Sequence, residues 1–237
     1  MNAPCIVLAG GLGTRLRCAV PDLPKCLAPI AGRPFLEWQL RSLAERGVER
    51  FVLALGYGAN LVMDSISQPW AHGLLIETVV ERELLGTGGA VRFAMEAIGL
   101  EDALVANGDT FLGGSLHEML APLDLAGGER MRMATVKVPD RTRFGGVNVD
   151  DMHRVTSFLE KGQTGAGLIN GGLYRIHRQV VDNEALGAFS LETQIMPRLV
   201  AQGALQARRL AGPFIDIGVP EDYNLFNTSL HDYVRPV

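Results

Sequence analysis

Short apolar runs alternate with stretches of helical periodicity along the first half of the chain. Four runs have the length and composition of strands: Cys5–Ala9, Phe51–Leu55, Leu74–Val80 and Ala103–Ala106. The first two are expected to be buried strands. Between them, apolar residues recur three or four positions apart, as at Leu36, Leu40 and Leu43, which predicts helices. Strand, loop and helix repeated in this order favour a parallel sheet with helices on both faces.

The second half has more polar and glycine-rich connections. Three runs there are expected to be strands added in antiparallel fashion: Met131–Val138, Gly146–Val149 and Leu168–Ile176. A helix is predicted after Ser190, kinked or shortened by Pro197, and a last strand and a closing helix are expected over residues 214–217 and 220–230. The predicted fold is therefore α/β: a Rossmann-like, mostly parallel mixed sheet flanked by helices, with a small antiparallel lobe.

Composition excludes several classes of protein. The 237 residues include 22 Lys and Arg against 26 Asp and Glu, and the net charge of −4 argues against a nucleic-acid-binding surface. The N-terminal apolar run is too short for a signal peptide or a membrane span. The three cysteines and five histidines lack metal-ligand spacing, so we expect reduced thiols in a cytoplasmic protein.

Two loops lie where a parallel sheet binds its ligands, beyond the carboxyl ends of strands: Gly10–Cys18 and Asn107–Asp109. The glycines of the first loop allow backbone N–H groups to approach a phosphate and form an anion-binding nest. The loop does not fit a dinucleotide fingerprint, because Leu16 occupies the third glycine position, and it lacks the ending of a P-loop. Arg15 can fork onto phosphate oxygens, and Lys25 adds a second cation.

Seven sequence blocks, in family order and spread over nearly the whole chain, resemble those of the sugar-1-phosphate nucleotidylyltransferases. The blocks are Leu8–Arg17 with Pro24-Lys25, Leu85–Ala90, Asn107–Asp109, Phe144–Val147, Phe158–Lys161, Asn170–Gly172 and Ile215–Gly218. Within the family, the glycine loop, the Leu-Gly-Thr-Gly-Gly-Ala block and the short length are most similar to D-glycero-D-manno-heptose-1-phosphate guanylyltransferases. We therefore expect one nucleotidyltransferase domain over 1–237, with a nucleotide-binding half (1–112) and a sugar-phosphate-binding half (113–237).

The reaction that this resemblance implies is transfer of GMP from GTP to D-glycero-α-D-manno-heptose 1-phosphate, giving GDP-heptose and pyrophosphate. The sugar phosphate is already an oxyanion near neutral pH, since its second pKa is about 6, so no general base is required. Repulsion between two polyanions is the obstacle, and positive charge and positioning overcome it. Another sugar 1-phosphate (mannose, glucose or N-acetylmuramic acid) with GTP, UTP or dTTP stays open. The implied role is in bacterial surface polysaccharides such as lipopolysaccharide or capsule.

The resemblance also implies roles for individual residues. Arg15 would bind the β- and γ-phosphates and stabilise the departing pyrophosphate, and Lys25 would lie between the α-phosphate and the attacking sugar phosphate. Lys161 would hold the sugar phosphate, with Glu160 accepting hydrogen bonds from sugar hydroxyls. The remaining contacts are expected with the sugar at Gly145 and Asn170, and with the nucleotide at Leu8, Ala9, Gly10, Gly11, Gly13, Thr14, Gly88, Asn107 and Gly108.

Acidic residues complete the predicted site. Mg²⁺ prefers one or two carboxylates plus phosphate oxygens, and Asp109 and Asp216 are expected to share it. The alternative to metal binding is that Asp109 is an Asx-turn residue and Asp216 is a buried, hydrogen-bonded carboxylate. Glu83 is predicted to accept hydrogen bonds from N1–H and the exocyclic amine of guanine, a donor pair that uracil and thymine lack. Glu81 is close by, and both glutamates lie just before an expected loop, Leu85–Ala90. Either glutamate could instead be a solvated strand-end residue.

The sequence also allows two other interpretations, each from a different class of protein. A regulatory module could bind a nucleotide sugar without turnover; loss of Lys25, Asp109 or Asp216 would have indicated this, and all three are present. An NAD-binding oxidoreductase would depend on the glycine loop alone, and Leu16 argues against it. The expected partners are GTP or another NTP and a sugar 1-phosphate, without nucleic acid or membrane. The oligomeric state is open, a homo-oligomer included.

Overall fold

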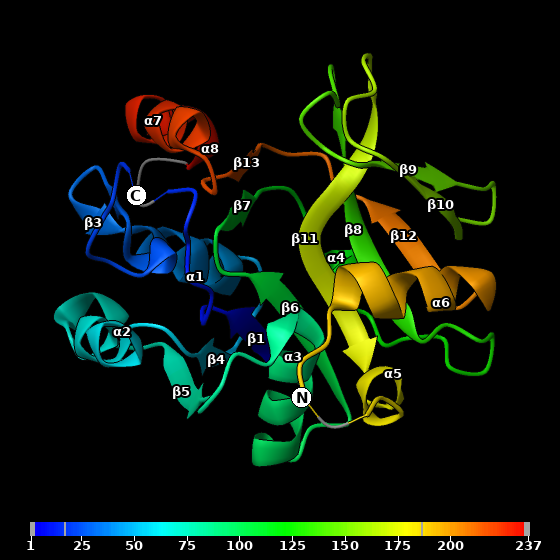
Figure 1. Cartoon of the computed structure of the whole chain (residues 1–237), viewed down its shortest axis with the longest axis horizontal. Coiled ribbons are helices and arrows are strands. Elements are labelled where there is room, and N and C mark those ends of the chain that lie inside the picture. The colour runs from blue at the N-terminus through cyan, green and yellow to red at the C-terminus, as the bar shows by residue number, and fades with distance from the viewer. Residues whose placement is uncertain (1–2, 17, 186, 235–237) are drawn as a thin grey trace.

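The computed structural model describes residues 3–16, 18–185 and 187–234. Its first half contains four parallel strands, which are β1 (Cys5–Leu8), β4 (Arg50–Leu55), β5 (Leu75–Val80) and β6 (Asp102–Asn107). β1 lies between β4 and β6, and β5 pairs with the far edge of β4 (Figure 1). Each strand agrees with a predicted apolar run to within one residue at either end, so the parallel sheet is confirmed.

The second half adds five more strands to the same sheet, and most of their pairings are antiparallel. They are β8 (Met131–Val138), β9 (Gly146–Val149), β10 (Val155–Leu159), β11 (Gly167–His177) and β12 (Leu205–Arg209). β11 pairs antiparallel with β6 and β8, and the path through the mixed sheet is β10-β9-β11-β6-β1-β4-β5. β9 and β10 form an antiparallel ribbon at one end of the sheet, which is the predicted small lobe (Figure 1). β12 pairs in parallel with β8; the sequence pattern predicted neither β10 nor β12.

Helices cover both faces of the sheet (Figure 1). One face carries α3 (Gly86–Ile98), α5 (Gln179–Asp182) and α6 (Met196–Ala201), and the other α1 (Phe35–Glu45), α2 (Ala59–Ile66) and α4 (His117–Leu120). Alternate residues of β1 divide between the two cores, with Ile6 on the first face and Cys5 and Val7 on the second. None of the described helices is both long and apolar enough to cross a membrane.

The segment after Ser190 forms two successive helices where one was expected. A π-helix, Leu191–Ile195, precedes α6, and Pro197 is the second residue of α6. Ser190 Oγ accepts a hydrogen bond from the backbone N–H of Thr193 at 3.2 Å, which confirms the predicted N-cap. Pro197 lies in the first turn of α6, where a helix tolerates a missing N–H, so the predicted kink or shortening at this residue stays a prediction.

A separate two-stranded ladder brings the end of the chain back to the middle of the molecule. β13 (Phe214–Asp216) pairs antiparallel with β7 (Thr110–Leu112), which directly follows β6 (Figure 1). Beneath it, the rings of Phe111 and Phe226 lie 5.3 Å apart, and Phe226 belongs to α7 (Pro220–Thr228). The other short elements are η1 (Lys25–Leu27), β2 (Pro29–Ile30), β3 (Arg33–Pro34), η2 (Pro69–Ala71) and α8 (Leu230–Tyr233).

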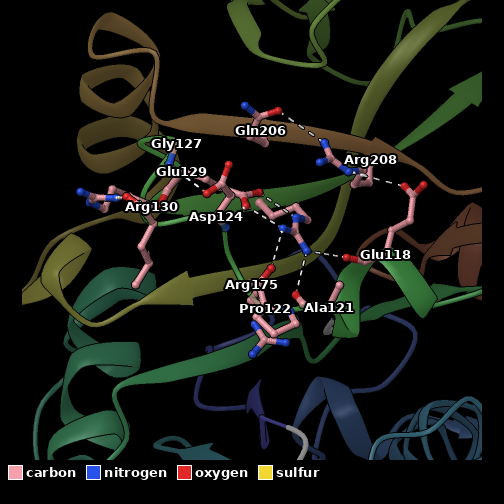
Figure 2. A network of polar contacts seen from close by, with 12 residues as sticks. Glu118, Ala121, Pro122, Asp124, Gly127, Glu129, Arg130, Arg175, Gln206 and Arg208 are labelled. Atoms are coloured by element: carbon pink, nitrogen blue, oxygen red, sulfur yellow. Dashed lines mark hydrogen bonds and ion pairs between the residues drawn. The ribbon is translucent and has the colours of Figure 1, made fainter.

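A buried ion pair fixes the chain that leads into β8. Arg132 and Glu129 are 4% and 3% exposed, and they form two hydrogen bonds of 2.7 and 2.6 Å. The remaining N–H groups of Arg132 donate to the backbone oxygens of Glu118, Ala121 and Pro122, and these three acceptor residues are labelled in Figure 2. All five donors of the guanidinium therefore have acceptors, which is the condition for burying such a charge.

Candidate active site

A cavity of about 510 Å³ opens at the carboxyl ends of β1 and β6, where parallel sheets bind ligands. Its wall consists of the glycine-rich segment after β1, the start of η1, the chain around the start of α3 and the turn after β6. The wall includes most of the residues predicted to contact the nucleotide: Leu8, Ala9, Gly10, Gly11, Gly13, Thr14, Arg15, Lys25, Asn107 and Gly108. It also includes Asp109, which was predicted as a metal ligand. Arg17, the last residue of the first block, lies outside the described residues.

Two glycines of the loop are required by close approaches. A side chain at Gly10 would begin 2.7 Å from Glu81 Oε1 and 3.0 Å from the backbone nitrogen of Gly56. Gly13 has a φ of +57°, and a Cβ there would lie 3.2 Å from that of Lys25. Glycine fits both positions without a steric clash or backbone strain. The backbone N–H groups of the loop can therefore approach an anion closely.

Opposite charges meet at one side of this cavity. Lys25 Nζ lies 2.5 Å from Asp109 Oδ2, with the two side chains 14% and 27% exposed. Asp216 enters from β13, where it pairs with Thr110, and the N–H of Ile217 donates to the backbone oxygen of Asp109 at 2.9 Å. The structure therefore brings together Lys25, Asp109 and Asp216, as the prediction of a shared site required.

The electrostatics around Asp216 fit a divalent cation. Burial raises the pKa of the Asp216 carboxyl, and the charge of Asp109 raises it further, while Lys25, the N–H of Gly218 and Arg15 offset part of this. Two carboxylates in each other's field are a donor set that a cation would stabilise. Among the described residues no three His, Cys, Asp or Glu side chains cluster as a metal site. The two aspartates therefore match the needs of Mg²⁺, which takes one or two carboxylates and completes its shell with substrate oxygens and water.

The residues predicted to bind the sugar phosphate lie outside the wall of the cavity. Glu160 and Lys161 are exposed in the loop after β10, and Gly145 lies just before β9. Asn170 is half-buried on β11, where its Nδ2 donates to the hydroxyl of Tyr174 at 2.8 Å. These positions share the lobe built from β9, β10 and β11, and their contacts with a sugar stay a prediction.

At the other end of the cavity, the two candidate glutamates differ in position. Glu81 is in the cavity wall, and its Oε2 accepts a hydrogen bond from the N–H of Leu85 at 3.1 Å. Burial raises the pKa of this carboxyl. Glu83 is exposed and is not in the wall. The structure thus brings Glu81 to the cavity, and readout of the base by Glu83 stays a prediction.

The block Leu85–Ala90, expected as a loop, is largely the beginning of α3. The N–H of Gly88 donates to the backbone oxygen of Phe189 at 3.0 Å, and the N–H of Phe189 donates to the oxygen of Leu85 at 3.0 Å. A side chain at Gly88 would overlap the Phe189 ring, so this glycine permits close packing of the helix and does not line the cavity.

Sequence reasoning did not find the contact between Thr87 and the π-helix. Thr87 lines the cavity, and its hydroxyl donates to Glu192 Oε2 at 2.6 Å. The same hydroxyl accepts a hydrogen bond from the N–H of Leu191 at 2.9 Å. These residues are more than a hundred positions apart in the chain, and no spacing pattern connects them. Only the fold brings the π-helix against the cavity wall.

The chain belongs to the nucleotidyl transferase family, whose model matches residues 5–232. It is 36% identical to the D-glycero-alpha-D-manno-heptose 1-phosphate guanylyltransferase of Campylobacter jejuni, over 93% of this chain and 97% of that protein. It is 35% identical to the mannose-1-phosphate guanylyltransferase of Mycobacterium tuberculosis, over 92% of this chain and 62% of that protein. The solved structure of HddC from Yersinia pseudotuberculosis complexed with GMP-PN superposes with a TM-score of 0.85 at 32% identity, covering 96% of this chain and 99% of that one. The predicted family and fold are confirmed.

Proposed function

We propose that this protein transfers GMP from GTP to D-glycero-α-D-manno-heptose 1-phosphate, forming GDP-heptose and pyrophosphate. The observation that carries the proposal is the meeting of Lys25, Asp109 and Asp216 beside a cavity lined by an anion-binding glycine loop. The relative named for this reaction supports the choice of substrates, since it matches over nearly its full length. The reduced cysteines support a cytoplasmic location, where NTPs are made.

The residues of the cavity suit a reaction between two polyanions. Backbone N–H groups of the glycine loop would hold the triphosphate, and Arg15 would bind its β- and γ-phosphates. An oxygen of the sugar phosphate attacks the α-phosphorus, the bond from that phosphorus to the β-phosphate oxygen breaks, and pyrophosphate leaves. Lys25 would stabilise the charge that accumulates around the α-phosphate, and Lys161 would hold the incoming phosphate.

Asp109 and Asp216 would hold Mg²⁺, which would neutralise charge on the triphosphate and orient it. Thermal unfolding gives a test that does not need turnover. We expect Mg²⁺ to raise the unfolding temperature of the GTP-bound protein, and Asp216→Asn to remove most of that increase because one ligand is lost. An equal increase in wild type and variant would contradict the shared site.

Selection of guanine would depend on a glutamate near the start of α3. We propose Glu81 for this role in addition to Glu83, because Glu81 lies in the cavity wall. A carboxylate there would accept from N1–H and the exocyclic amine, and inosine lacks that amine. Glu81→Gln should therefore reduce the preference for GTP over ITP, while the matched change Glu83→Gln should not. The opposite result would return the role to Glu83.

The sugar is the less constrained half of the proposal. Gly145, Glu160, Lys161 and Asn170 would contact it, and all four belong to the lobe outside the cavity wall. Mannose 1-phosphate is the second candidate, because the mannose-1-phosphate guanylyltransferase relative is nearly as similar as the heptose enzyme. Heptose 1-phosphate and mannose 1-phosphate would react by the same mechanism. The two candidate functions therefore differ only in which sugar the pocket of this lobe accepts.

The deciding experiment measures pyrophosphate release with Mg²⁺ across four NTPs and several sugar 1-phosphates. We expect the highest kcat/KM with GTP and heptose 1-phosphate, and loss of activity in Asp216→Asn and Lys25→Ala. Preference for mannose 1-phosphate would select the second candidate. Absence of turnover by a folded protein that still binds GTP would contradict both and favour a regulatory module.

A further inference from the structure

The loop between β8 and β9 holds the segment that carries Glu160 and Lys161. The N–H of Gly162 donates to the backbone oxygen of Thr142 at 2.9 Å. The N–H of Arg141 donates to the oxygen of Gly165 at 3.1 Å. These backbone hydrogen bonds attach the predicted sugar-phosphate segment to this loop.

The same loop is attached on its other side to the chain around Asp216. Arg143 forms a bidentate ion pair with Asp222, with Nη1–Oδ1 and Nη2–Oδ2 distances of 2.8 and 2.5 Å. The next residue, Phe144, packs edge to face on Phe214 with ring centroids 5.7 Å apart. Phe214 begins β13, and Asp222 lies in the first turn of α7, so these contacts are on either side of Asp216 in the sequence.

The ion pair lies within the electrostatic field of Asp216. The hydrogen bonds that Arg143 donates to Asp222 raise the pKa of Arg143, and the charges of Asp222, Glu221 and Asp216 raise it further. The Arg143 side chain is 51% exposed and that of Asp222 only 11%. An ion pair with one partner this exposed contributes little to stability. Its geometric effect is different, because a bidentate pair fixes the orientation of both partners.

We propose that the Arg143–Asp222 pair is a clamp that sets the position of the sugar-phosphate segment relative to the metal carboxylates. Arg143 is then a positioning residue for guanylyl transfer, and this role rests on the proposed function. The attacking phosphate would be held by Lys161 on one segment, and the metal by Asp216 on another. A misplacement of about 1 Å between reacting groups can cost on the order of 100-fold in rate.

The first experiment compares Arg143→Ala with wild type by steady-state kinetics, GTP binding and thermal unfolding. We expect kcat/KM for the sugar 1-phosphate to fall on the order of 10- to 100-fold, because the reacting groups lose their alignment. The affinity for GTP and the unfolding temperature should stay near wild type. Arg154→Ala is the matched control, since it removes a similarly exposed Arg–Asp pair in the turn between β9 and β10 and should leave the kinetics unchanged.

The second experiment tests the clamp without turnover. Hydrogen exchange of residues 157–165 should become faster in Arg143→Ala and return toward wild type in the exchanged pair Arg143→Asp with Asp222→Arg. The same double variant should recover part of the lost kcat/KM. Unchanged exchange and kinetics in Arg143→Ala would overturn the clamp, and so would a loss of GTP affinity and stability, which would indicate a general structural role. If wild type turns over no sugar 1-phosphate, the proposed function fails, while the exchange result still decides whether the clamp exists.

Discussion

Lys25 is the cation with the most restrained environment in the cavity. Its ammonium is close to Asp109, its side chain is only 14% exposed, and it follows a rigid Pro24 at the start of η1. We expect Lys25→Met to lower kcat by about 10²- to 10³-fold, as loss of a preorganised charge near the reacting phosphate does elsewhere. Lys25→Arg should restore little, because a planar fork replaces a compact ammonium. Pyrophosphate release at saturating GTP measures this, and near-normal activity of Lys25→Met would contradict the role.

Asp216 should make the stability of the metal-free protein depend on pH. Its pKa is raised above the ordinary 3.8, so folding favours the protonated carboxyl. The stability that this proton provides is complete below pH 3.8 and is lost as pH rises through the higher folded value. Asp216→Asn should flatten this part of the profile. Unfolding temperatures in EDTA between pH 4 and 7 test the sign, and an Asp216→Asn profile parallel to wild type would contradict it.

At the scale of elements, the start of α3 depends on its contact with Phe189. A methyl group at Gly88 would overlap that ring, so Gly88→Ala must displace the helix or the ring. Overpacking of this kind costs about 1–3 kcal/mol of stability. We expect KM for GTP to rise as well, because Thr87 lines the cavity beside it. Adding Phe189→Leu should relieve the overlap and recover part of both losses; no recovery would exclude packing as the cause.

The elements that could be predicted from sequence were those with one dominant pattern. β1 and β4 are continuous apolar runs, and α1 repeats its apolar positions at helical spacing. β10 and β12 were missed because their exposed polar residues weaken the signal, and partners elsewhere in the sheet fix them instead. The start of α3 was expected as a loop because glycine disfavours helices in isolation; contact with Phe189 overrides that preference.

On the scale of the whole molecule, stability and catalysis depend on separate charges. Glu129 neutralises the buried Arg132, and neither residue lines the cavity. Glu129→Gln should lower the free energy of unfolding by about 3–5 kcal/mol, since it leaves an uncompensated buried charge. The matched change Glu118→Gln removes an exposed partner of Arg208 and should cost at most about 1 kcal/mol. Denaturant titration measures both, and similar losses would contradict the importance of burial.

The motifs named many residues that the structure places in the cavity wall, but they did not predict the spatial arrangement. Lys25, Asp109 and Asp216 were candidates because cations and carboxylates after strands have a recognisable chemistry. Their meeting depends on the pairing of β7 with β13, which no local pattern encodes. The position of Glu81 in the wall, ahead of Glu83, likewise depends on how the chain turns into α3.

The pairing of β7 with β13 has a consequence for synthesis of the protein. Most strands of the sheet are complete by residue 209, yet Asp216 arrives only with β13 and is held by the N–H of Gly218. A chain still emerging from the ribosome would therefore contain the strands around the cavity before it contains the proposed second metal ligand. On the proposed mechanism, a product terminated before Asp216 should not turn over its substrates.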